Sequence, residues 1–229
     1  MIKEAIILAG GLGTRLRSAV PDLPKCMAPI HGRPFISYVI NYLHSQGVER
    51  FIFSLGYMHE VIASYIKEHY SELDLEFIIE EEPLGTGGAI KYSCSKAKSA
   101  DVLITNGDTF FDIDVEALSD FHADKKADCT LSLKPMQQFD RYGVVTLDDN
   151  ERITSFKEKR FYESGLINGG LYALNVPSFL SEDFPEKFSF EQHYLEAFYG
   201  SKNMYGCVQD AYFIDIGIPE DYKKAQAEL

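Results

Sequence analysis

The stretch AIILAGGLGTRLRSAVPDLPKCM, residues 5–27, decides the fold of this chain. It opens with an almost wholly apolar run, residues 5–9, which is typical of a parallel strand buried on both faces. The run leads directly into glycines, whose backbone amides can face a ligand, and Arg15, Arg17 and Lys25 follow. Positive charge therefore gathers where a strand ends, and we interpret the stretch as a nucleoside triphosphate site.

Two other phosphate-binding loops fit this stretch less well. A dinucleotide-binding fingerprint requires GxGxxG, and here Leu16 stands at the last glycine position. A Walker A loop requires Gly-Lys-Ser/Thr, which the stretch lacks. A bare tight turn would need the glycines but neither Arg15 nor Lys25, so the joint pattern favours a phosphate site.

The composition is that of an ordinary soluble enzyme. The chain has 229 residues, of which 45% are hydrophobic and 25% charged, and its formal net charge is -13. We expect no nucleic-acid partner, because nucleic-acid binding needs a broad basic surface, and no membrane association, because no apolar run approaches the roughly 20 residues that span a bilayer. The four cysteines show neither a CxxC pair nor a metal-binding spacing, which favours reduced thiols and a cytoplasmic location.

Strand and helix patterns alternate through the first half of the chain. They predict strands at residues 5–9, 51–55, 75–79 and 101–105, and helices at 35–47, 59–70 and from about 89, after a glycine turn at 83–88. Such alternation predicts right-handed crossovers and a central, mostly parallel sheet. The second half predicts strands at 128–133, 143–147, 153–158, 166–174 and 206–216, and helices at 190–199 and from 219.

The fold class that follows is α/β, with a mixed, mostly parallel central sheet flanked by helices and a small β-hairpin lid. We expect a single domain over residues 1–229, with the hairpin region at about 134–175 inserted in the same domain. The reason is that no linker, low-complexity segment or internal repeat separates the two halves.

Motifs along nearly the whole chain resemble those of the sugar-1-phosphate nucleotidylyltransferases, also called nucleotide-sugar pyrophosphorylases. These motifs are LAGGLGTRL (8–16), PKCM (24–27), PLGTGGA (83–89), NGD (106–108), YG (142–143), FKEK (156–159), INGG (167–170) and DIGIPEDY (215–222). Cys26 stands where the family usually has proline, and Arg160 stands where proline is common. The resemblance implies the family's Rossmann-like, three-layer nucleotidyltransferase fold, which is GT-A-like.

The resemblance also implies a reaction: a sugar 1-phosphate oxygen attacks the α-phosphorus of a nucleoside triphosphate and pyrophosphate leaves. Because two anions must meet, Arg15 and Lys25 are the implied catalytic residues, Arg15 at the departing pyrophosphate and Lys25 over the α-phosphate and the incoming phosphate. The alternative for Lys25 is a solvated loop lysine. The implied nucleotide-binding residues are Leu8, Gly10, Gly11, Gly13, Thr14, Glu80, Pro83, Gly85, Thr86 and Gly107.

Two aspartates are candidate metal ligands. Asp108 and Asp215 each follow or end a predicted strand, so both can reach the crevice at the carboxyl edge of the sheet. Two carboxylates with phosphate oxygens and water form an oxygen-only shell suited to Mg²⁺, with Mn²⁺ as a substitute. The alternative is that Asp108 only caps the following turn and Asp215 only the last helix.

The hairpin region carries the implied sugar contacts. The resemblance assigns Glu158 to sugar hydroxyls and Lys159 to the sugar phosphate, yet on a regular strand these two would point to opposite faces. We therefore expect a bulge or the end of the strand there, the alternative being an exposed, solvated pair. The implied sugar-phosphate-binding residues are Tyr142, Gly143, Glu158, Lys159, Asn168 and Gly169.

The choice of base depends on Glu80, which occupies the place where family members contact the base. A carboxylate accepts both the N1–H and N2–H₂ donors of guanine, whereas uracil and thymine suit an amide better. Glu80 therefore favours GTP. The alternative is that Glu80, Glu81 and Glu82 are a charge run on a solvated face.

At finer grain, VPDLPK (20–25), GDTFF (107–111) and DRYG (140–143) resemble the D-glycero-α-D-manno-heptose 1-phosphate guanylyltransferases. The expected partners are thus GTP and this sugar 1-phosphate, in the supply of GDP-heptose for surface polysaccharide, and the family resemblance is compatible with a homodimer. The enzyme alternatives are mannose 1-phosphate with GTP, or a hexose or N-acetylmuramate 1-phosphate with UTP or dTTP. A catalytically inactive, nucleotide-sugar-sensing regulatory subunit is disfavoured, because the chain retains Arg15, Lys25, Asp108 and Asp215.

Overall fold

A nine-stranded sheet forms the centre of the molecule. The computed structural model describes residues 1–11, 13–16 and 18–229, so Leu12 and Arg17 of the glycine-rich stretch lie outside the described residues. The strands of the sheet are β1 (Glu4–Ala9), β4 (Arg50–Leu55), β5 (Asp74–Ile79), β6 (Asp101–Asn106), β8 (Cys129–Phe139), β9 (Val144–Leu147), β10 (Ile153–Lys157), β11 (Tyr162–Asn175) and β12 (Met204–Val208). Two small sheets pair β2 (Pro29–Ile30) with β3 (Arg33–Pro34) and β7 (Thr109–Phe111) with β13 (Phe213–Asp215).

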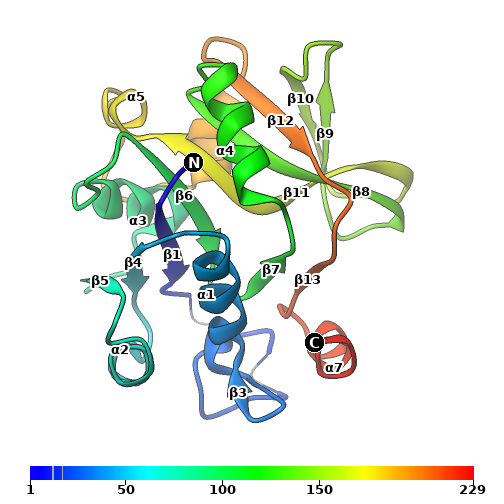
Figure 1. Cartoon of the computed structure of the whole chain (residues 1–229). Coiled ribbons are helices and arrows are strands. Elements are labelled where there is room, and N and C mark those ends of the chain that lie inside the picture. Colours follow the sequence, from blue (N-terminus) through cyan, green and yellow to red (C-terminus); the bar gives the residue numbers. More distant parts are fainter. Residues whose placement is uncertain (12, 17) are drawn as a thin grey trace.

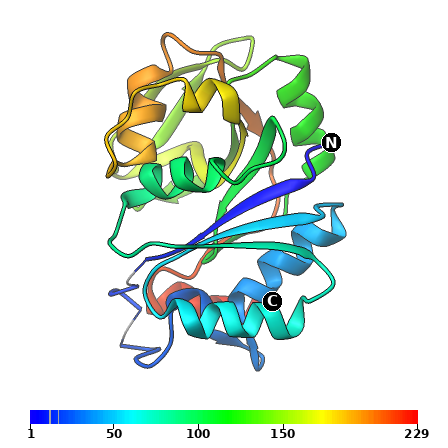
Figure 2. The ribbon, with the colours of Figure 1, turned by 90° about the vertical axis from the view of Figure 1, so that its left-hand side faces the viewer.

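Helices lie on both faces of this sheet, which gives three layers (Figures 1 and 2). They are η1 (a 3-10 helix, Lys25–Met27), α1 (Phe35–Ser45), α2 (His59–His69), α3 (Gly85–Cys94), α4 (Val115–Asp124), α5 (Val176–Leu180), η2 (a π-helix, Glu191–Leu195), α6 (Glu196–Phe198) and α7 (Pro219–Glu228). Figure 2 shows α1, α2 and α7 beneath the sheet and α3 above it.

The sheet is mixed, which confirms the predicted α/β class. Its main path runs β10-β9-β11-β6-β1-β4-β5, and β8 pairs with β11 and β12. Strands β6, β1, β4 and β5 are parallel, as the strand–helix alternation predicts, whereas β11 is antiparallel to both β6 and β8. The predicted hairpin of β9 and β10 is present, and its antiparallel register is interrupted between Ile153 and Ser155.

Alternate side chains of β1 pack into opposite layers of the fold, which explains why residues 5–9 are all apolar. Ala5, Ile7 and Ala9 pack in the cluster that includes α1, α2, α4 and α7, and Ile6 packs in the cluster that includes α3, α5 and η2. Because a strand has a side-chain period of two, both faces must be apolar when helices cover both. The helices thus bury the strand and leave its carboxyl end for the glycine loop.

The sequence places the start of α3 wrongly. The helix begins at Gly85 and not near residue 89, so the second glycine stretch forms its first turn. A Cβ on Gly87 would lie 2.2 Å from the Phe188 ring, and one on Gly88 would lie 2.4 Å from the backbone oxygen of Glu186. These two glycines therefore serve close packing of the helix, which sequence patterns do not distinguish from a turn.

One prediction in the second half is also wrong. The single strand predicted at 206–216 is divided between β12 in the central sheet and β13 in a small one. The chain turns away after β12, where the Gln209 amide exchanges hydrogen bonds with the Asp114 backbone N–H and C=O. The helix predicted at 190–199 is confirmed, and it consists of the π-helix η2 followed by the single turn α6. The sequence analysis did not identify α4, α5 or β7.

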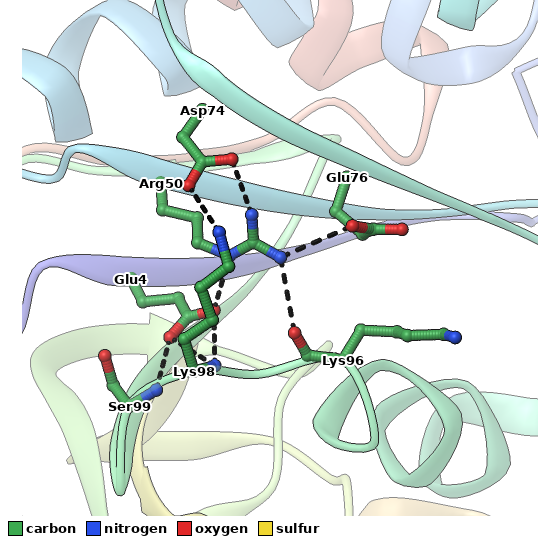
Figure 3. A network of polar contacts seen from close by, with 7 residues as sticks. All are labelled: Glu4, Arg50, Asp74, Glu76, Lys96, Lys98 and Ser99. Carbon is green, nitrogen blue, oxygen red and sulfur yellow. Dashed lines mark hydrogen bonds and ion pairs between the residues drawn. The ribbon is translucent and has the colours of Figure 1, made fainter.

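An ionic network around the buried pair Glu4 and Arg50 joins the amino ends of β1, β4 and β5 (Figure 3). Glu4, 1% exposed, accepts hydrogen bonds from Arg50 Nε at 2.9 Å and from the backbone N–H groups of Lys98 and Ser99. Arg50 also pairs with Asp74 at 2.6 Å. Buried charges of this kind are tolerated because their hydrogen bonds are satisfied.

In the part of the chain that the structure describes, no helix combines the length and apolar character needed to cross a bilayer. The hairpin region, from β8 to β11, continues the same sheet as β1. That residues 1–229 form one domain stays a prediction.

Candidate functional site

A cleft of about 250 Å³ opens at the carboxyl end of β1. The loop after the strand folds closely over Lys25: Gly13 has φ +56°, and a Cβ there would lie 2.8 Å from Lys25 Cβ. Glycine is thus required at this position by both backbone conformation and space. We name this the loop cleft, which is lined by Leu8, Ala9, Gly11, Gly13, Thr14, Arg15, Pro24, Lys25, Cys26, Asp108 and Gly217.

The carboxylates of Asp108, which lines the loop cleft, and of Asp215 share one cation. Lys25 Nζ lies 2.5 Å from Asp108 Oδ2 and 3.2 Å from Asp215 Oδ1, and the Lys25 side chain is only 12% exposed. Lys25 is therefore not a solvated loop lysine. Lys25 lies in the cleft beside the glycine loop, and Arg15 lines the same cleft.

The two small strands β7 and β13 bring the aspartates together. Asp108 lies in the turn between β6 and β7, Asp215 ends β13, and Asp215 is in register with Thr109. Asp215 Oδ1 also accepts the Gly217 N–H at 2.8 Å, but the N-cap of α7 is Ile218, without a side-chain cap. Asp215 thus shapes a local turn and does not cap the last helix.

The donor set of this pair fits a hard divalent cation. The carboxylates of Asp108 and Asp215 converge on a single positive charge, that of Lys25, and carboxylate oxygen is the preferred ligand of Mg²⁺. No group of three or more His, Cys, Asp or Glu among the described residues could hold a metal ion. A Mg²⁺ ion here would therefore complete its shell with substrate oxygens or water, as ions in phosphate-transfer sites do.

A second cleft of about 550 Å³ lies beneath the hairpin. Strand β10 ends at Lys157, so Glu158 and Lys159 follow the end of the strand and both line this cleft, in agreement with the expected distortion. We name it the hairpin cleft. Its lining residues are Tyr142, Gly143, Val144, Val145, Phe156, Lys157, Glu158, Lys159, Asn168, Ser189, Glu191, Gln192, Leu195 and Glu196.

Tyr142 connects the two clefts electrostatically. Burial is the main cause of a rise in the pKa of its phenol to about 12, and Asp215 contributes to that rise. The Tyr142 ring contacts Phe213, two residues before the Asp215 that pairs with Lys25, with the ring centroids 5.9 Å apart. The phenol is protonated at neutral pH and can donate a hydrogen bond.

Asn168 presents a fixed amide to the hairpin cleft. Its Nδ2 donates to the Tyr172 hydroxyl at 2.8 Å, and its Oδ1 accepts the Gly170 N–H at 2.9 Å. The neighbouring Gly169 is buried, and a Cβ there would lie 2.4 Å from the Phe111 ring. Packing against Phe111 is therefore sufficient to explain this glycine, and its contact with a sugar stays a prediction.

Glu80 is separated by its contacts from the charge run in which it stands. Its two carboxylate oxygens accept the Ser54 hydroxyl at 2.9 Å and the Leu84 N–H at 3.2 Å, whereas Glu81 and Glu82 are exposed. A Cβ on Gly10 would lie 2.6 Å from Glu80 Oε1, so the carboxylate lies directly beside the glycine loop. Glu80 is therefore not part of a charge run on a solvated face.

The remaining nucleotide candidates are held by backbone and hydroxyl contacts. Gly85 has φ +72°, which favours glycine, and the Gly107 N–H donates to the Leu8 carbonyl at 2.8 Å. Pro83 and Glu80 border a further cleft of about 820 Å³ along α3. Thr86 Oγ1 donates to Glu191 Oε2 at 2.8 Å.

The sequence analysis missed Glu191, which lines the hairpin cleft. Its partner Thr86 is 105 residues away in the chain, so no local motif marks the pair. Cys26 has no chemical role in the loop cleft, because burial raises the pKa of its thiol to about 12 and keeps it protonated.

Comparison with known proteins identifies the family. A family model described as nucleotidyl transferase matches residues 4–229. The chain belongs to the nucleotidyl transferase family. Among its relatives is a D-glycero-alpha-D-manno-heptose 1-phosphate guanylyltransferase from Aneurinibacillus thermoaerophilus, 52% identical over 226 residues, which are 99% of this chain and 98% of the relative.

Two further family members are similar over almost their whole length. A Campylobacter jejuni protein with the same name is 47% identical over 219 residues, 96% of each chain. The crystal structure of HddC from Yersinia pseudotuberculosis complexed with GMP-PN matches with a TM-score of 0.89 and 39% identity, covering 99% of both chains. Membership of the family and the fold that the sequence motifs imply are thereby confirmed.

Proposed function

We propose that this protein transfers the guanylyl group of GTP to D-glycero-α-D-manno-heptose 1-phosphate, giving GDP-heptose and pyrophosphate. The observation that carries the proposal is the Lys25 ammonium held between Asp108 and Asp215 under the glycine loop, next to a second cleft for a polar ligand. The relatives at 52% and 47% identity support the choice of sugar, and the GMP-PN bound to HddC supports the choice of base.

The reaction is one substitution at phosphorus. A phosphate oxygen of the sugar 1-phosphate forms a bond to the α-phosphorus, the bond from that phosphorus to the β-phosphate oxygen breaks, and pyrophosphate leaves with the electron pair. The protein needs no covalent nucleophile. Its task is to bring two anions together, and Lys25 and Arg15, both lining the loop cleft, supply fixed positive charge for this.

The glycine loop binds the triphosphate through its backbone. Gly11 and Gly13 line the loop cleft without side chains, so their amides can approach phosphate oxygens closely. We assign Arg15 to the departing pyrophosphate and Lys25 to the α-phosphate. Asp108 and Asp215 would hold Mg²⁺, or Mn²⁺ in its place, and the ion would supply further positive charge against phosphate oxygens.

Glu80 selects the base in this proposal. Ser54 and Leu84 each donate one hydrogen bond to the Glu80 carboxylate, which leaves acceptor capacity on both oxygens, since an ionised carboxylate has about four lone-pair sites. Guanine offers two adjacent donors for these sites. Uracil and thymine would set a carbonyl oxygen against the carboxylate, which is repulsive.

The hairpin cleft holds the sugar 1-phosphate. Lys159 is assigned to the phosphate, and Glu158, Asn168 and the Gly143 backbone to sugar hydroxyls, all of which line this cleft. We place the reaction in the cytoplasm, because the four cysteines are free thiols, as in reducing compartments. A homodimer stays a prediction.

The proposal is tested by pyrophosphate release with each of GTP, UTP and dTTP against heptose, mannose, glucose and N-acetylmuramate 1-phosphates, with Mg²⁺. We expect the highest kcat/KM for GTP with D-glycero-α-D-manno-heptose 1-phosphate. A higher kcat/KM for mannose 1-phosphate would show that the protein catalyses the same reaction with a different sugar. If the protein binds nucleotides but releases no pyrophosphate with any pair, it is a sensing subunit and the proposal fails.

A further inference from the structure

One acidic side chain of the hairpin cleft has no place in the reaction described above. Glu191 is the first residue of η2, half-buried, and it lines the cleft together with Glu158 and Asn168. π-helical turns are rare and occur frequently at functional sites, because the wider turn directs a side chain that an α-helix would place elsewhere. Glu191 thus belongs to a different element from the residues that the sequence motifs assign to the sugar.

The carboxylate of Glu191 is held in one orientation by two hydroxyl groups. Thr86 Oγ1 donates to Oε2 at 2.8 Å, and Ser189 Oγ donates to the same oxygen at 2.9 Å. Thr86 is fixed in turn, because its hydroxyl accepts the Phe190 N–H at 2.9 Å. Among the described residues no hydrogen bond reaches Oε1, so one oxygen is anchored and the other is free for a ligand.

Glu191 and the fixed amide of Asn168 line the same cleft. The Tyr172 ring packs against Phe190, the residue before Glu191, with the ring centroids 5.3 Å apart. The hydroxyl of Tyr172 accepts the hydrogen bond of Asn168 Nδ2. Asn168 and Glu191 are therefore connected behind the cleft through buried Tyr172 and Phe190.

We propose that Glu191 is a sugar-specificity residue, whose free carboxylate oxygen accepts a hydrogen bond from a hydroxyl of the sugar 1-phosphate. This inference rests on the proposed function, since it places the sugar in the hairpin cleft. A carboxylate can only accept, so it binds a sugar hydroxyl as donor and rejects a sugar that lacks this hydroxyl. Being anchored by Thr86 and Ser189, it loses little conformational freedom on binding.

The substitution Glu191→Gln separates this role from a structural one. The glutamine carbonyl oxygen can still accept from Thr86 and Ser189, but the position of the oxygen that has no partner becomes an NH₂ donor. We expect the KM for heptose 1-phosphate to rise about 10- to 100-fold, as for loss of a hydrogen bond to a charged group, with the KM for GTP and the melting temperature unchanged. Glu68→Gln, at an exposed glutamate of α2 that lines neither the loop cleft nor the hairpin cleft, is the matched control and should behave as the wild type.

Monodeoxy analogues of the sugar 1-phosphate complete the test as a double-mutant cycle. For the analogue that lacks the contacted hydroxyl, wild type and Glu191→Gln should have the same KM, whereas the penalty persists for the other analogues. The inference is overturned if the variant has the wild-type KM for heptose 1-phosphate, or if the penalty is the same for every analogue or extends equally to GTP. If the wild type turns over no sugar 1-phosphate, the proposed function fails and this inference fails with it.

Discussion

At the scale of a single residue, Lys25 shows how much of the site can be predicted from the sequence. Its motif predicted a cation at the glycine loop, and the structure places the ammonium between Asp108 and Asp215, from segments about 80 and 190 residues away. Local motifs predicted all three: Lys25 belongs to the glycine-rich stretch, and each aspartate lies at the end of a strand. Glu191 could not be predicted in this way, because its orientation depends on Thr86, which the sequence pattern assigned only to the nucleotide.

Replacement of Lys25 tests its role directly. We expect Lys25→Met to lower kcat by about 100- to 1,000-fold, the usual loss when one preorganised positive or donor group is removed from a site of developing charge. Pyrophosphate release measures the effect. Lys224→Met, which removes an exposed lysine that pairs with Glu228 at 3.8 Å, is the control for loss of one positive charge. Near wild-type turnover of Lys25→Met would contradict the mechanism.

At the scale of elements, the strands of the first half were predicted better than the short elements of the second. Long apolar runs such as β1 and β4 identify themselves, because a strand covered on both faces needs them. The three-residue strands β7 and β13 carry no such signal, although their pairing brings Asp108 to Asp215. The helix α4 was missed because its buried face carries the polar residues Ser119 and His122, which weaken the apolar pattern.

Buried His122 of α4 makes the packing of this helix on the sheet sensitive to pH. Its Nδ1 lies 2.8 Å from Thr130 Oγ1 of β8, and burial lowers the pKa of the imidazole, while Asp101, 3.5 Å from Nε2, opposes the shift in part. The folded protein thus binds the proton more weakly than the unfolded chain. The resulting stability is complete above the unfolded pKa of about 6.5 and is lost as the pH falls towards the folded pKa.

We therefore expect the free energy of unfolding to fall more steeply for the wild type than for His122→Gln between about pH 7.5 and pH 5.5. Urea titrations at several pH values measure this difference. Other groups titrate equally in both proteins, so the comparison isolates His122. Parallel curves for the two proteins would show that the histidine does not contribute to the pH dependence.

At the scale of the whole molecule, the carboxyl and amino ends of the strands in the sheet have different roles. The carboxyl edge carries the loop cleft, as ligand sites of open α/β sheets do, and the amino edge carries the Glu4–Arg50 network (Figure 3). The alternation of strands and helices predicted the position of the loop cleft, because it determines where the parallel strands end. It could not predict that Glu4 would be buried, since a single acidic residue before a strand usually lies on the surface.

Removal of Glu4 should affect stability and leave catalysis unchanged. Glu4→Ala leaves Arg50, 7% exposed, without its buried partner, so we expect a loss of about 3 kcal/mol in the free energy of unfolding. Lys3→Ala, which breaks the exposed pair with Glu49, is the control and should cost less than about 1 kcal/mol. Both are measured by urea unfolding. Equal effects of the two substitutions would show that the network adds nothing beyond a surface pair.

The central claim, guanylyl transfer to a heptose 1-phosphate, is tested most directly by competition in a single reaction. GTP, UTP, dTTP, CTP and ATP at equal concentrations are incubated with D-glycero-α-D-manno-heptose 1-phosphate, Mg²⁺ and the protein, and the nucleotide sugars are quantified by mass. Because competing substrates partition by kcat/KM, GDP-heptose should exceed each other product by about 100-fold or more. A mixture dominated by UDP-heptose or dTDP-heptose would contradict the account.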